Sequence, residues 1–465
     1  MNKLYTIAIH FLLCAFSFTS YAQYTKLLDF AGTTNGSKPY YTSLFSDGTF
    51  LYGMTSSGGA ANNGVIFKVK TDGSSFTKLL DFGVGLNGAL PDGSLVSDGT
   101  FLYGMTSLSG ANNMGLVFKI KTDGTGYSDI LDFAGSTNGK YPYGSLFFDG
   151  TFLYGMTNSG GTNNFGVIFK IKTDGSSYTK LFDFADTANG FNPDGSLISD
   201  GTFLYGMTLN GGANNLGVVF KIKTDGSSYT KLLDFAGATN GSNPLTSLLS
   251  DGTFLYGMTK FGGASNNGVI FKIKPDGTSY SKLFDFAGAA TGSVPDGTLI
   301  SDGTFLYGMT TGGGANTEGV IFKIKKDGTG YSVLIDFAGV ANGEWPAGSL
   351  ISDGTYLYGM TWKGGTNNLG VLFKLQQYGT GISKTNNYAR QFSVYPNPAK
   401  DIIYINDLQC LVNYRLLNIT GTNLKVGSVE PGKNSIGLCN LVPGLYWLQL
   451  FDNDNGPYNV IINKE

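Results

Sequence analysis

One short string of residues recurs along this chain and limits strongly what it can fold into. Leu-Tyr-Gly-Met-Thr begins at seven positions spaced 51 residues apart: Leu51, Leu102, Leu153, Leu204, Leu255, Leu306 and Leu357. A second marker, Asp-Phe, keeps this spacing from Asp29 to Asp336, except for one extra residue inserted after Pro39. A repeat of this length is one supersecondary unit that cannot bury its apolar surface alone, so neighbouring copies must pack together.

Each repeat contains four short runs of strand-forming residues. In the second repeat these runs are Ser94–Ser97, Phe101–Thr106, Gly115–Lys121 and Tyr127–Phe133. Asp-Gly joins the first run to the second and the third to the fourth, and it favours hairpins because Gly adopts positive φ cheaply. No segment shows a sustained helical period. We therefore predict an all-β chain in which every repeat forms a four-stranded antiparallel sheet.

Seven such sheets favour a seven-bladed β-propeller over residues 23–380. Tyr24–Phe30 is a fourth-type strand without a repeat of its own, and the seventh repeat decays after Val371–Leu375 into residues 382–387. We expect Tyr24–Phe30 to complete the last blade, which leaves no open edge. A β-solenoid is the alternative, disfavoured because its units are usually shorter and lack paired Asp-Gly hairpins.

The first 22 residues are typical of a secretory signal peptide. Lys3 supplies a positive start, an apolar run follows, and Ser20-Tyr21-Ala22 gives a cleavage pattern. The apolar run is shorter than the roughly 18–20 residues that a membrane span needs, which disfavours an anchor. We expect no membrane span once this segment is removed.

Composition excludes several classes of function. The single histidine, His10, lies in the leader, so the mature chain lacks Ser-His-Asp and Cys-His nucleophiles and histidine-ligated metals. A net charge of −2 provides no field for nucleic acid. We expect no metal and no cofactor.

Aspartates recur at equivalent positions in nearly every repeat, in Asp-Phe and in the Asp-Gly turns. Catalysis needs an asymmetric set of groups with separated pKa values, so these shared carboxylates are interpreted as structural. Glu318 and Glu344 are the only glutamates of the repeats, and no acidic cluster specific to one blade stands out. We predict no catalytic residues and expect that the protein is not an enzyme.

Variation between repeats is concentrated in the loops that join strands two to three and four to one, which share one face of a blade. Aromatic and short amide side chains suit carbohydrate, because sugars offer both C–H patches and hydroxyls. Drift in tolerant surface loops is the alternative. Tyr40, Tyr41 and Tyr143 vary there, and the ligand-binding candidates are Tyr141, Phe191, Lys260, Phe261, Trp345, Trp362 and Lys363.

The repeat stops after residue 380, and a polar linker at residues 381–391 leads to a segment of different composition at residues 392–465. Five strand-like runs separated by turns predict a small Ig-like β-sandwich there. Two cysteines of the mature chain, Cys410 and Cys439, lie in this segment. In an oxidising compartment they are candidates for a disulfide, and two buried thiols on separate strands are the alternative.

The repeats, over residues 24 to 380, resemble the GloVer tandem repeat of secreted bacterial proteins. The C-terminal segment resembles the type A sorting domain of the type IX secretion system, on the motif residues Tyr395, Pro396, Asn397, Pro398, Gly421, Gly444, Tyr446 and Lys464. The second resemblance implies the type IX secretion machinery and its sortase as partners. It also implies a secreted or outer cell-surface location.

These observations favour a secreted β-propeller that acts as a binding or adhesion module for a glycan or protein ligand. The alternatives are a polysaccharide-active enzyme that uses carboxylates without histidine, and a structural surface protein.

Overall fold

The computed structural model describes residues 23–83, 87–185, 187–377, 394–406, 408, 412–418, 423–451 and 458–465. The predicted signal peptide and linker therefore lie outside the described residues. The chain divides after Gln377 into a repeat unit and a C-terminal unit, which are described separately. Every regular element among the described residues is a β-strand. The described part of the chain contains no helix that is long and apolar enough to cross a membrane.

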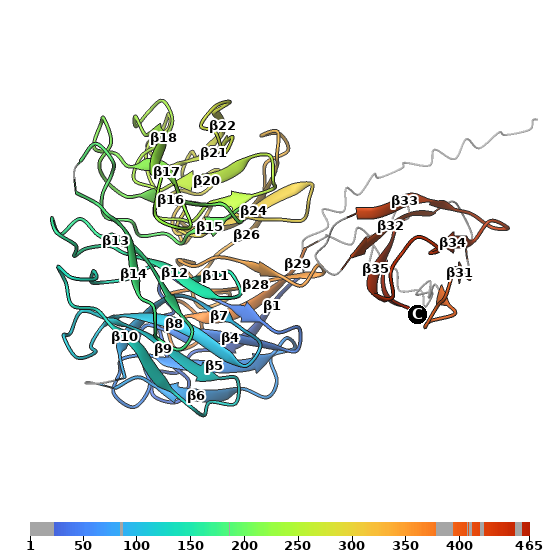
Figure 1. The fold of residues 1–465 in the computed structure, drawn as a ribbon, viewed down its shortest axis with the longest axis horizontal. Coiled ribbons are helices and arrows are strands. Elements are labelled where there is room, and N and C mark those ends of the chain that lie inside the picture. Colours follow the sequence, from blue (N-terminus) through green and yellow to red (C-terminus); the bar gives the residue numbers. More distant parts are fainter. Residues whose placement is uncertain are drawn as a thin grey trace, which may run out of the picture. The chain divides into compact units, whose positions relative to one another are not determined.

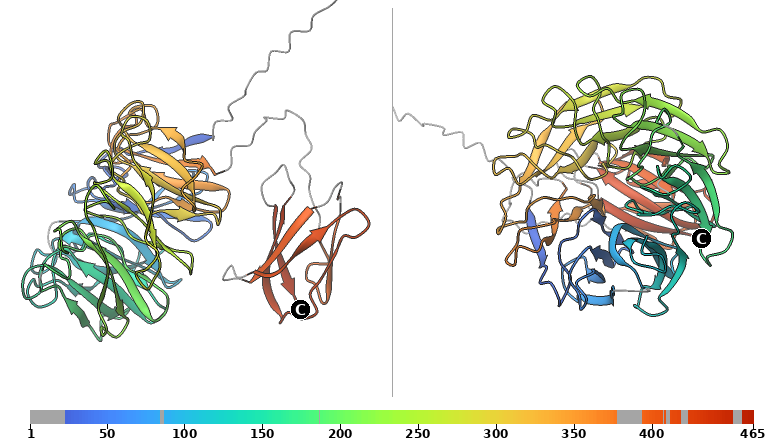
Figure 2. Two further views of the ribbon diagram at one scale, coloured as in Figure 1. Left: turned by 90° about the horizontal axis from the view of Figure 1, so that it is seen from above. Right: turned by 90° about the vertical axis from the view of Figure 1, so that its left-hand side faces the viewer.

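The repeat unit contains seven sheets, which succeed one another in chain order (Figures 1 and 2). The first three repeats supply β2 (Thr42–Ser43), β3 (Phe45–Ser46), β4 (Phe50–Thr55), β5 (Val65–Lys70) and β6 (Thr77–Asp81); β7 (Ala89–Ser97), β8 (Phe101–Leu108), β9 (Leu116–Lys121) and β10 (Ser128–Asp132); and β11 (Phe147–Phe148), β12 (Phe152–Thr157), β13 (Val167–Lys172) and β14 (Thr179–Asp183).

The next three repeats form sheets of the same order. Their strands are β15 (Ile198–Ser199), β16 (Phe203–Thr208), β17 (Val218–Lys223) and β18 (Thr230–Asp234); β19 (Leu249–Ser250), β20 (Leu255–Thr259), β21 (Val269–Ile273) and β22 (Ser281–Asp285); and β23 (Ile300–Ser301), β24 (Phe305–Thr310), β25 (Val320–Lys325) and β26 (Ser332–Asp336). The prediction of an all-β chain with one four-stranded antiparallel sheet per repeat is confirmed.

The last sheet joins the two ends of the repeat unit. It contains β27 (Ile351–Ser352), β28 (Tyr356–Met360) and β29 (Val371–Gln376) from the seventh repeat, and β1 (Tyr24–Asp29) pairs antiparallel with β29. The predicted pairing of the N-terminal strand with the last repeat is therefore confirmed. The second sheet gains a fifth strand, because β2 of the first repeat pairs in parallel with β7.

The core of the repeat unit lies between adjacent sheets. Seven buried clusters each combine residues of two neighbouring repeats, and one of them joins the seventh repeat to the first through Tyr358, Leu372 and Phe67. The Leu-Tyr-Gly-Met strands are buried on both faces because a sheet packs on each side. Gly53 makes room for the ring of Phe67 opposite it, which a Cβ would meet at 2.5 Å.

The C-terminal unit has two antiparallel sheets that share one hydrophobic core. One sheet contains β30 (Val394–Tyr395), β31 (Ile402–Ile405) and β34 (Ser435–Gly437), and the other contains β33 (Asn423–Val429), β32 (Val412–Asn418), β35 (Gly444–Phe451) and β36 (Tyr458–Lys464).

Candidate functional site

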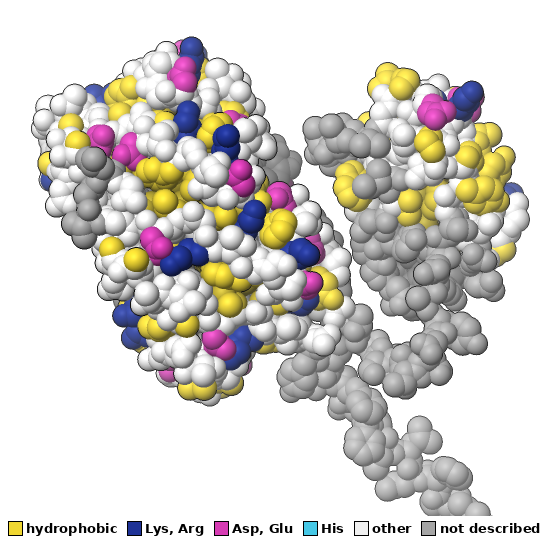
Figure 3. All heavy atoms as spheres, turned by 90° about the horizontal axis from the view of Figure 1, so that it is seen from below, with side chains coloured by type: hydrophobic (Ala, Val, Ile, Leu, Met, Phe, Trp, Pro, Cys, Tyr) yellow, Lys and Arg dark blue, Asp and Glu magenta, His cyan; other side chains and the backbone are white. Residues whose placement is uncertain are grey.

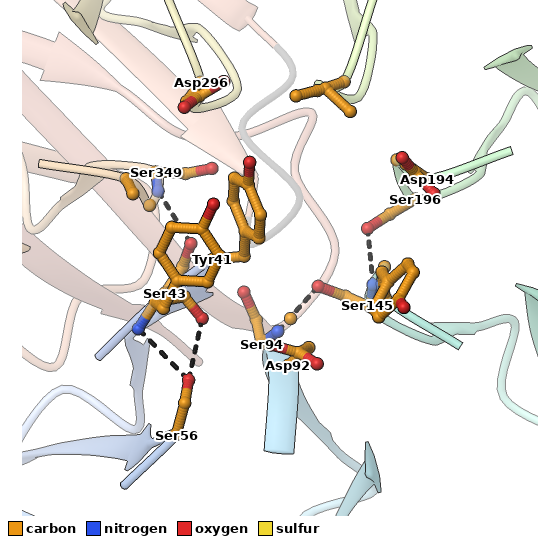
Figure 4. Close-up of a pocket in the computed structure, with 18 of the residues that line it drawn as sticks. Tyr41, Ser43, Ser56, Asp92, Ser94, Ser145, Asp194, Ser196, Asp296 and Ser349 are labelled. Atoms are coloured by element: carbon orange, nitrogen blue, oxygen red, sulfur yellow. Dashed lines mark hydrogen bonds between the residues drawn. The ribbon is translucent and has the colours of Figure 1, made fainter. Parts of the chain in front are cut away.

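A cavity of about 860 Å³ lies where the segments that enter the first strands of the repeats come together (Figure 4). All seven repeats contribute to its wall, and the lining is a mixture of tyrosine, serine and aspartate side chains. We call it the main cavity. A smaller side cavity of about 340 Å³ adjoins it and shares Tyr40, Asp296, Ala347 and Trp362 with it.

A chain of hydrogen bonds frames the main cavity. The N–H of Ser94 donates to the Ser145 hydroxyl at 2.7 Å, and the same bond links Ser145 to Ser196 and Ser349 to Ser43. Equivalent bonds join the remaining repeats at Ser247, Thr298 and Ser349. These bonds link the second repeat through the seventh to the first, while the first and second repeats are joined there by the parallel pairing of β2 with β7.

Small residues allow the backbones to approach this closely. A Cβ on Gly144 would overlap the carbonyl oxygen of Gly195, and a Cβ on Gly348 would overlap that of Thr42. Glycine is required at these positions because two backbones from different repeats meet there.

The residue after each proline points its side chain at the main cavity, and its type alternates around the wall. Aspartate occupies this position in the second, fourth and sixth repeats, as Asp92, Asp194 and Asp296. The other repeats contribute Tyr40, Tyr143, Leu245 and Ala347, and in the first repeat Tyr41 follows Tyr40 and also lines the cavity. The three carboxylates therefore come from alternate repeats, spaced 102 residues apart in the chain.

Burial dominates the electrostatics of the three aspartates. It raises the pKa of Asp92 to about 7, where the charge of Asp194 adds to the rise and a hydrogen bond from Ser107 opposes it. Burial also raises the pKa of Asp194 to about 6, although a hydrogen bond from Asn158 and the positive charge of Lys260 both lower it. These carboxyls exchange protons near neutral pH, unlike exposed aspartates.

Asp296 is the least satisfied of the three. Burial raises its pKa to about 6, and the charge of Lys260 and a hydrogen bond from Thr311 oppose the rise. The Thr311 hydroxyl donates to Oδ2 at 3.4 Å, and Lys260 Nζ lies 3.8 Å from Oδ1. Oδ1 is buried and has no hydrogen-bond donor among the described residues.

The extra residue after Pro39 has a direct structural effect. It displaces the chain so that Tyr40 and Tyr41 both face the cavities, with Tyr41 in the left-handed region at φ 53°. Figure 4 places Tyr41 among the labelled aspartates and serines. Burial and the negative charge of Asp296 raise the pKa of Tyr41 far above its ordinary range, which keeps the hydroxyl protonated.

A continuous run of aromatic rings leads from the loops into the main cavity. The ring of Tyr41 lies 4.0 Å from that of Tyr40, which lies 5.0 Å from Trp362, and Trp362 stacks on Trp345 at 5.3 Å. The ammonium group of Lys363 lies 4.1 Å from the centroid of Trp345, in a cation–π arrangement.

Four of the seven candidates from the sequence line a cavity. Tyr141 lines the main cavity, Lys260 and Trp345 line the side cavity, and Trp362 lines both. Tyr141 and Trp345 stand immediately before a proline, with φ of 57° and 54°. The N–H of Trp362 donates to the carbonyl of Trp345, which holds the two side chains together at the rim.

The other three candidates lie outside both linings. Each of them forms an isolated antiparallel β-bridge within the loops: Phe191 with Asn210, Phe261 with Ser242, and Lys363 with Glu344. Lys363 contacts the rim through its ammonium group, which lies over the rings of Trp345 and Trp362. Phe191 packs instead on Phe165, with ring centroids 4.8 Å apart.

The shared aspartates are held by the backbone. In the hairpin after the first strand, Asp98 Oδ1 accepts the N–H groups of Thr100 and Phe101, and Oδ2 accepts the Tyr103 hydroxyl at 2.6 Å. The Asp-Phe aspartate of the same repeat, Asp132, accepts the N–H of Ala111. Their contacts agree with the structural interpretation. The methionines of the seven Leu-Tyr-Gly-Met-Thr strings are buried between sheets, as Met105 illustrates.

No acidic cluster specific to one blade was expected, and the structure instead brings together three aspartates from three different repeats. At the proline that precedes the first strand of a repeat, Pro-Asp-Gly occurs in the second, fourth and sixth repeats, at Asp92, Asp194 and Asp296, whereas Pro275-Asp276-Gly277 lies in the hairpin between β21 and β22. This pattern was visible in the sequence, but each aspartate is isolated in the chain by 102 residues. Only the convergence of the repeats brings them to one cavity.

Glu318 and Glu344 also interact, since burial and the charge of Glu318 raise the pKa of Glu344.

The predicted sorting motif is assembled around the chain end. Asn397 accepts the N–H of Asn463 at 2.8 Å, and the N–H of Ala399 donates to the carbonyl of Asn463. Lys464 is buried and lies 3.8 Å from a carboxylate oxygen of Asp401. The Tyr-Pro-Asn-Pro segment and the last strand are thus neighbours in space.

The other motif residues are distributed over both sheets. Tyr395 is exposed and stacks on Tyr404, and the peptide bonds before Pro396 and Pro398 are cis. Gly444 begins β35, and the buried Tyr446 donates to the carbonyl of Val442 at 2.6 Å. Gly421 lies outside the described residues.

Cys439 is exposed rather than buried, and its Sγ lies 3.7 Å from the carbonyl oxygen of Asp401. Cys410 lies outside the described residues, so its pairing with Cys439 stays a prediction.

Among the described residues no cluster of three or more His, Cys, Asp or Glu side chains has an arrangement that holds a metal ion. The face drawn in Figure 3 mixes Lys and Arg with Asp and Glu.

Two solved structures share this fold. One is an oligogalacturonate lyase in complex with manganese, 13% identical, with a TM-score of 0.51 over 77% of this chain and 94% of that chain. The other is the extracellular domain of a hybrid two-component system from B. thetaiotaomicron, 16% identical, with a TM-score of 0.51 over 96% of this chain and 59% of that chain. At these identities the likeness concerns the propeller-like fold alone. No curated protein matches the chain.

Family models match both parts of the chain. The Gloeobacter/Verrucomicrobia repeat matches residues 14–147, 96–254, 147–303 and 248–408. The secretion system C-terminal sorting domain matches residues 393–463. The chain therefore belongs to the Gloeobacter/Verrucomicrobia repeat family and carries a C-terminal sorting domain of the type IX secretion system.

Proposed function

We propose that this protein is a glycan-binding module of the outer cell surface, built on a closed seven-bladed β-propeller. The glycan binds in the main cavity and along its rim. The observation that carries this proposal is the aromatic run from Trp345 through Trp362 and Tyr40 to Tyr41, which leads from the loops into a cavity lined by hydroxyl and carboxylate groups.

Closure of the propeller is supported by three contacts between the first and seventh repeats. β1 pairs with β29, the Ser349 N–H donates to the Ser43 hydroxyl, and one buried cluster combines residues of both repeats. In a closed ring the seven first strands converge, so a cavity lined by every repeat is expected at the centre.

The chemistry of the lining suits a sugar. Aromatic faces cover the C–H patches of a pyranose ring, while serine hydroxyls and aspartate oxygens match its hydroxyl groups. The cavity volume of about 860 Å³ is within the range of about 300–1,000 Å³ that ligand pockets span. A sugar of several units fits better than a single one, because the aromatic run continues outside the main cavity.

The sorting domain indicates secretion to the outer surface. We propose that it is recognised by the type IX machinery and its sortase, after removal of residues 1–22 as a signal peptide. In this arrangement residues 23–380 are the binding domain, residues 381–391 a linker and residues 392–465 the exported tail.

A glycan array followed by calorimetry on the secreted protein tests the proposal. We expect binding to an oligosaccharide that the Trp345→Ala/Trp362→Ala variant loses, with no turnover. Trp447→Ala, which removes an exposed tryptophan of the C-terminal unit, is the matched control and should bind normally. Absence of binding to every glycan offered would reject the proposal and favour a structural role.

A polysaccharide-active enzyme is the second candidate. The pKa values of Asp92 and Asp194, raised to about 7 and 6 in one cavity, suit general acid–base chemistry near neutral pH. Release of reducing ends that Asp194→Asn abolishes would support the enzyme. Binding without release of reducing ends, in the same assay, would support the module.

A further inference from the structure

The main cavity contains three buried carboxyl groups. Asp92, Asp194 and Asp296 all line it, and each is nine-tenths or more buried. The described cations at the two cavities are Lys38, on the wall of the main cavity, and Lys260, in the side cavity. Lys260 is the cation that acts on Asp194 and Asp296, whereas the groups that act on Asp92 are Ser107 and Asp194.

Asp296 offers a buried acceptor to a ligand. Its side chain is 5% exposed, its Oδ2 accepts one hydroxyl, and its Oδ1 has no hydrogen-bond donor among the described residues. A buried carboxylate oxygen without a donor costs the full desolvation of that group. Lys260 Nζ, at 3.8 Å, is too far to donate a hydrogen bond.

The surroundings of Asp296 specify what would complete it. In Figure 4 the carboxylate lies at the cavity wall on the same side as Tyr41. The side cavity places Tyr40, Trp345 and Trp362 next to it. A group that donates several hydrogens and carries positive charge would satisfy Oδ1, while the attached ring lies against the aromatic run.

We propose that the cavity binds an oligosaccharide that contains an amino sugar with a free, positively charged amino group, that Asp296 receives this ammonium group, and that Asp194 adds negative charge across the cavity (Figure 4). The inference rests on the glycan binding proposed above. It adds the chemical class of the ligand, which the aromatic run alone does not specify.

Acetylation of the amine distinguishes this proposal from simpler ones. An N-acetyl group keeps one N–H but removes the charge, so it leaves the carboxylates uncompensated. An acidic sugar would place its own negative charge beside the carboxyl groups of the cavity and is disfavoured. A neutral sugar can bind through its hydroxyls, but then Asp296 gains no counter-charge.

Calorimetry with four tetrasaccharides tests the inference without any variant. The probes are the β-1,4 tetramers of glucosamine, N-acetylglucosamine and glucose, and the α-1,4 tetramer of galacturonic acid, each titrated at pH 6.5 into the secreted protein. We expect the glucosamine tetramer to bind at least about tenfold more tightly than the other three, which is the size expected for a charge-assisted hydrogen bond.

Two variants locate the charge effect. Asp296→Asn and Asp194→Asn should each weaken binding of the glucosamine tetramer about tenfold and leave the N-acetylated tetramer unaffected. Asp276→Asn, which removes an exposed carboxylate from the hairpin between β21 and β22 at the opposite end of its sheet, is the control and should not change either affinity.

The outcomes separate the two proposals. Equal affinity for the glucosamine and neutral tetramers, or tighter binding of the galacturonic acid tetramer, would overturn the amino-sugar inference and leave glycan binding intact. The same inference fails if Asp296→Asn and Asp194→Asn both retain the preference for the free amine. If no tetramer binds and a wider glycan array is also negative, the proposed function itself is wrong.

Discussion

The indole rings of Trp345 and Trp362 stack with centroids 5.3 Å apart and planes inclined by 26°. A backbone hydrogen bond from Trp362 to the carbonyl of Trp345 sets this geometry, so the stack does not depend on side-chain packing alone. These are two of the three tryptophans of the protein, and the third, Trp447, lies in the C-terminal unit. The candidate site therefore contains its own spectroscopic probe.

Ligand binding should change the tryptophan fluorescence. A sugar that covers the Trp345–Trp362 stack excludes water from it, so emission should shift to shorter wavelength and acrylamide quenching should fall. Fluorescence titration checks this on the wild type and on Trp362→Phe, which should lose most of the response. Trp447→Phe should retain it. A response that persists in Trp362→Phe and disappears in Trp447→Phe would place the ligand elsewhere.

Tyr41→Ala should weaken ligand binding by about tenfold or more, because its ring ends the aromatic run inside the main cavity and central aromatic anchors dominate binding energy. Tyr41→Phe should lose less, since the ring remains. The measurement is calorimetry with the oligosaccharide that the array identifies. Tyr404→Ala, an exposed tyrosine of the C-terminal unit, provides the comparison. Equal affinities for Tyr41→Ala and wild type would remove Tyr41 from the site.

Asp92→Asn should stabilise the protein at alkaline pH and not at acidic pH. Burial raises the folded-state pKa of Asp92 to about 7, above the unfolded value of about 3.9. Its contribution to stability is therefore complete below about pH 4 and is lost as the pH rises to about 7, at a total cost of up to about 4 kcal/mol. Asparagine carries no such titration.

Denaturant unfolding at pH 4 and pH 8 measures this effect. The difference in unfolding free energy between Asp92→Asn and wild type should become more favourable to the variant by about 1–4 kcal/mol at pH 8. Asp123→Asn, in an exposed hairpin, should show no such increase. A gain that is equal at both pH values would mean that Asp92 is not protonated in the folded state near neutral pH.

Ser43→Ala should destabilise the repeat unit as much as Ser145→Ala. Each change removes the hydroxyl that accepts a backbone N–H from another repeat, from Ser349 and Ser94 respectively, at the same distance of 2.7 Å. Loss of an acceptor for a part-buried N–H costs about 1–3 kcal/mol. Chemical denaturation of the two variants makes the comparison. A neutral Ser43→Ala beside a costly Ser145→Ala would contradict closure between the first and seventh repeats.

Much of the fold could be predicted because its signals are local and repeated. The Asp-Gly turns give glycine positive φ, as at Gly99 and Gly124, and the strand boundaries follow from apolar runs between them. The role of Tyr24–Phe30 was also predictable, since the seventh repeat lacks a fourth strand. The length of the first strand was not, because β7 extends to Ala89 while its equivalents in the other repeats are two residues long.

The candidate site was predictable only in part. Tyr141, Lys260, Trp345 and Trp362 were identified from variation between repeats, but the same criterion selected Phe191, Phe261 and Lys363, which do not line either cavity. Variation marks a loop as free to change. It does not tell which residues of a loop line a cavity, because that depends on the φ angle of the residue before each proline, as at Tyr141 and Trp345.

The sequence by itself determined the length of the repeat, the four strands of each repeat, the pairing between the first and last strands of the repeat unit, and the sorting domain. Tertiary structure alone decided that Asp92, Asp194 and Asp296 share a cavity with Tyr41. The physical reason is distance along the chain: a turn or strand is specified by neighbours a few residues apart. The cavity instead arises where seven backbones converge, and it joins residues that are 102 positions apart.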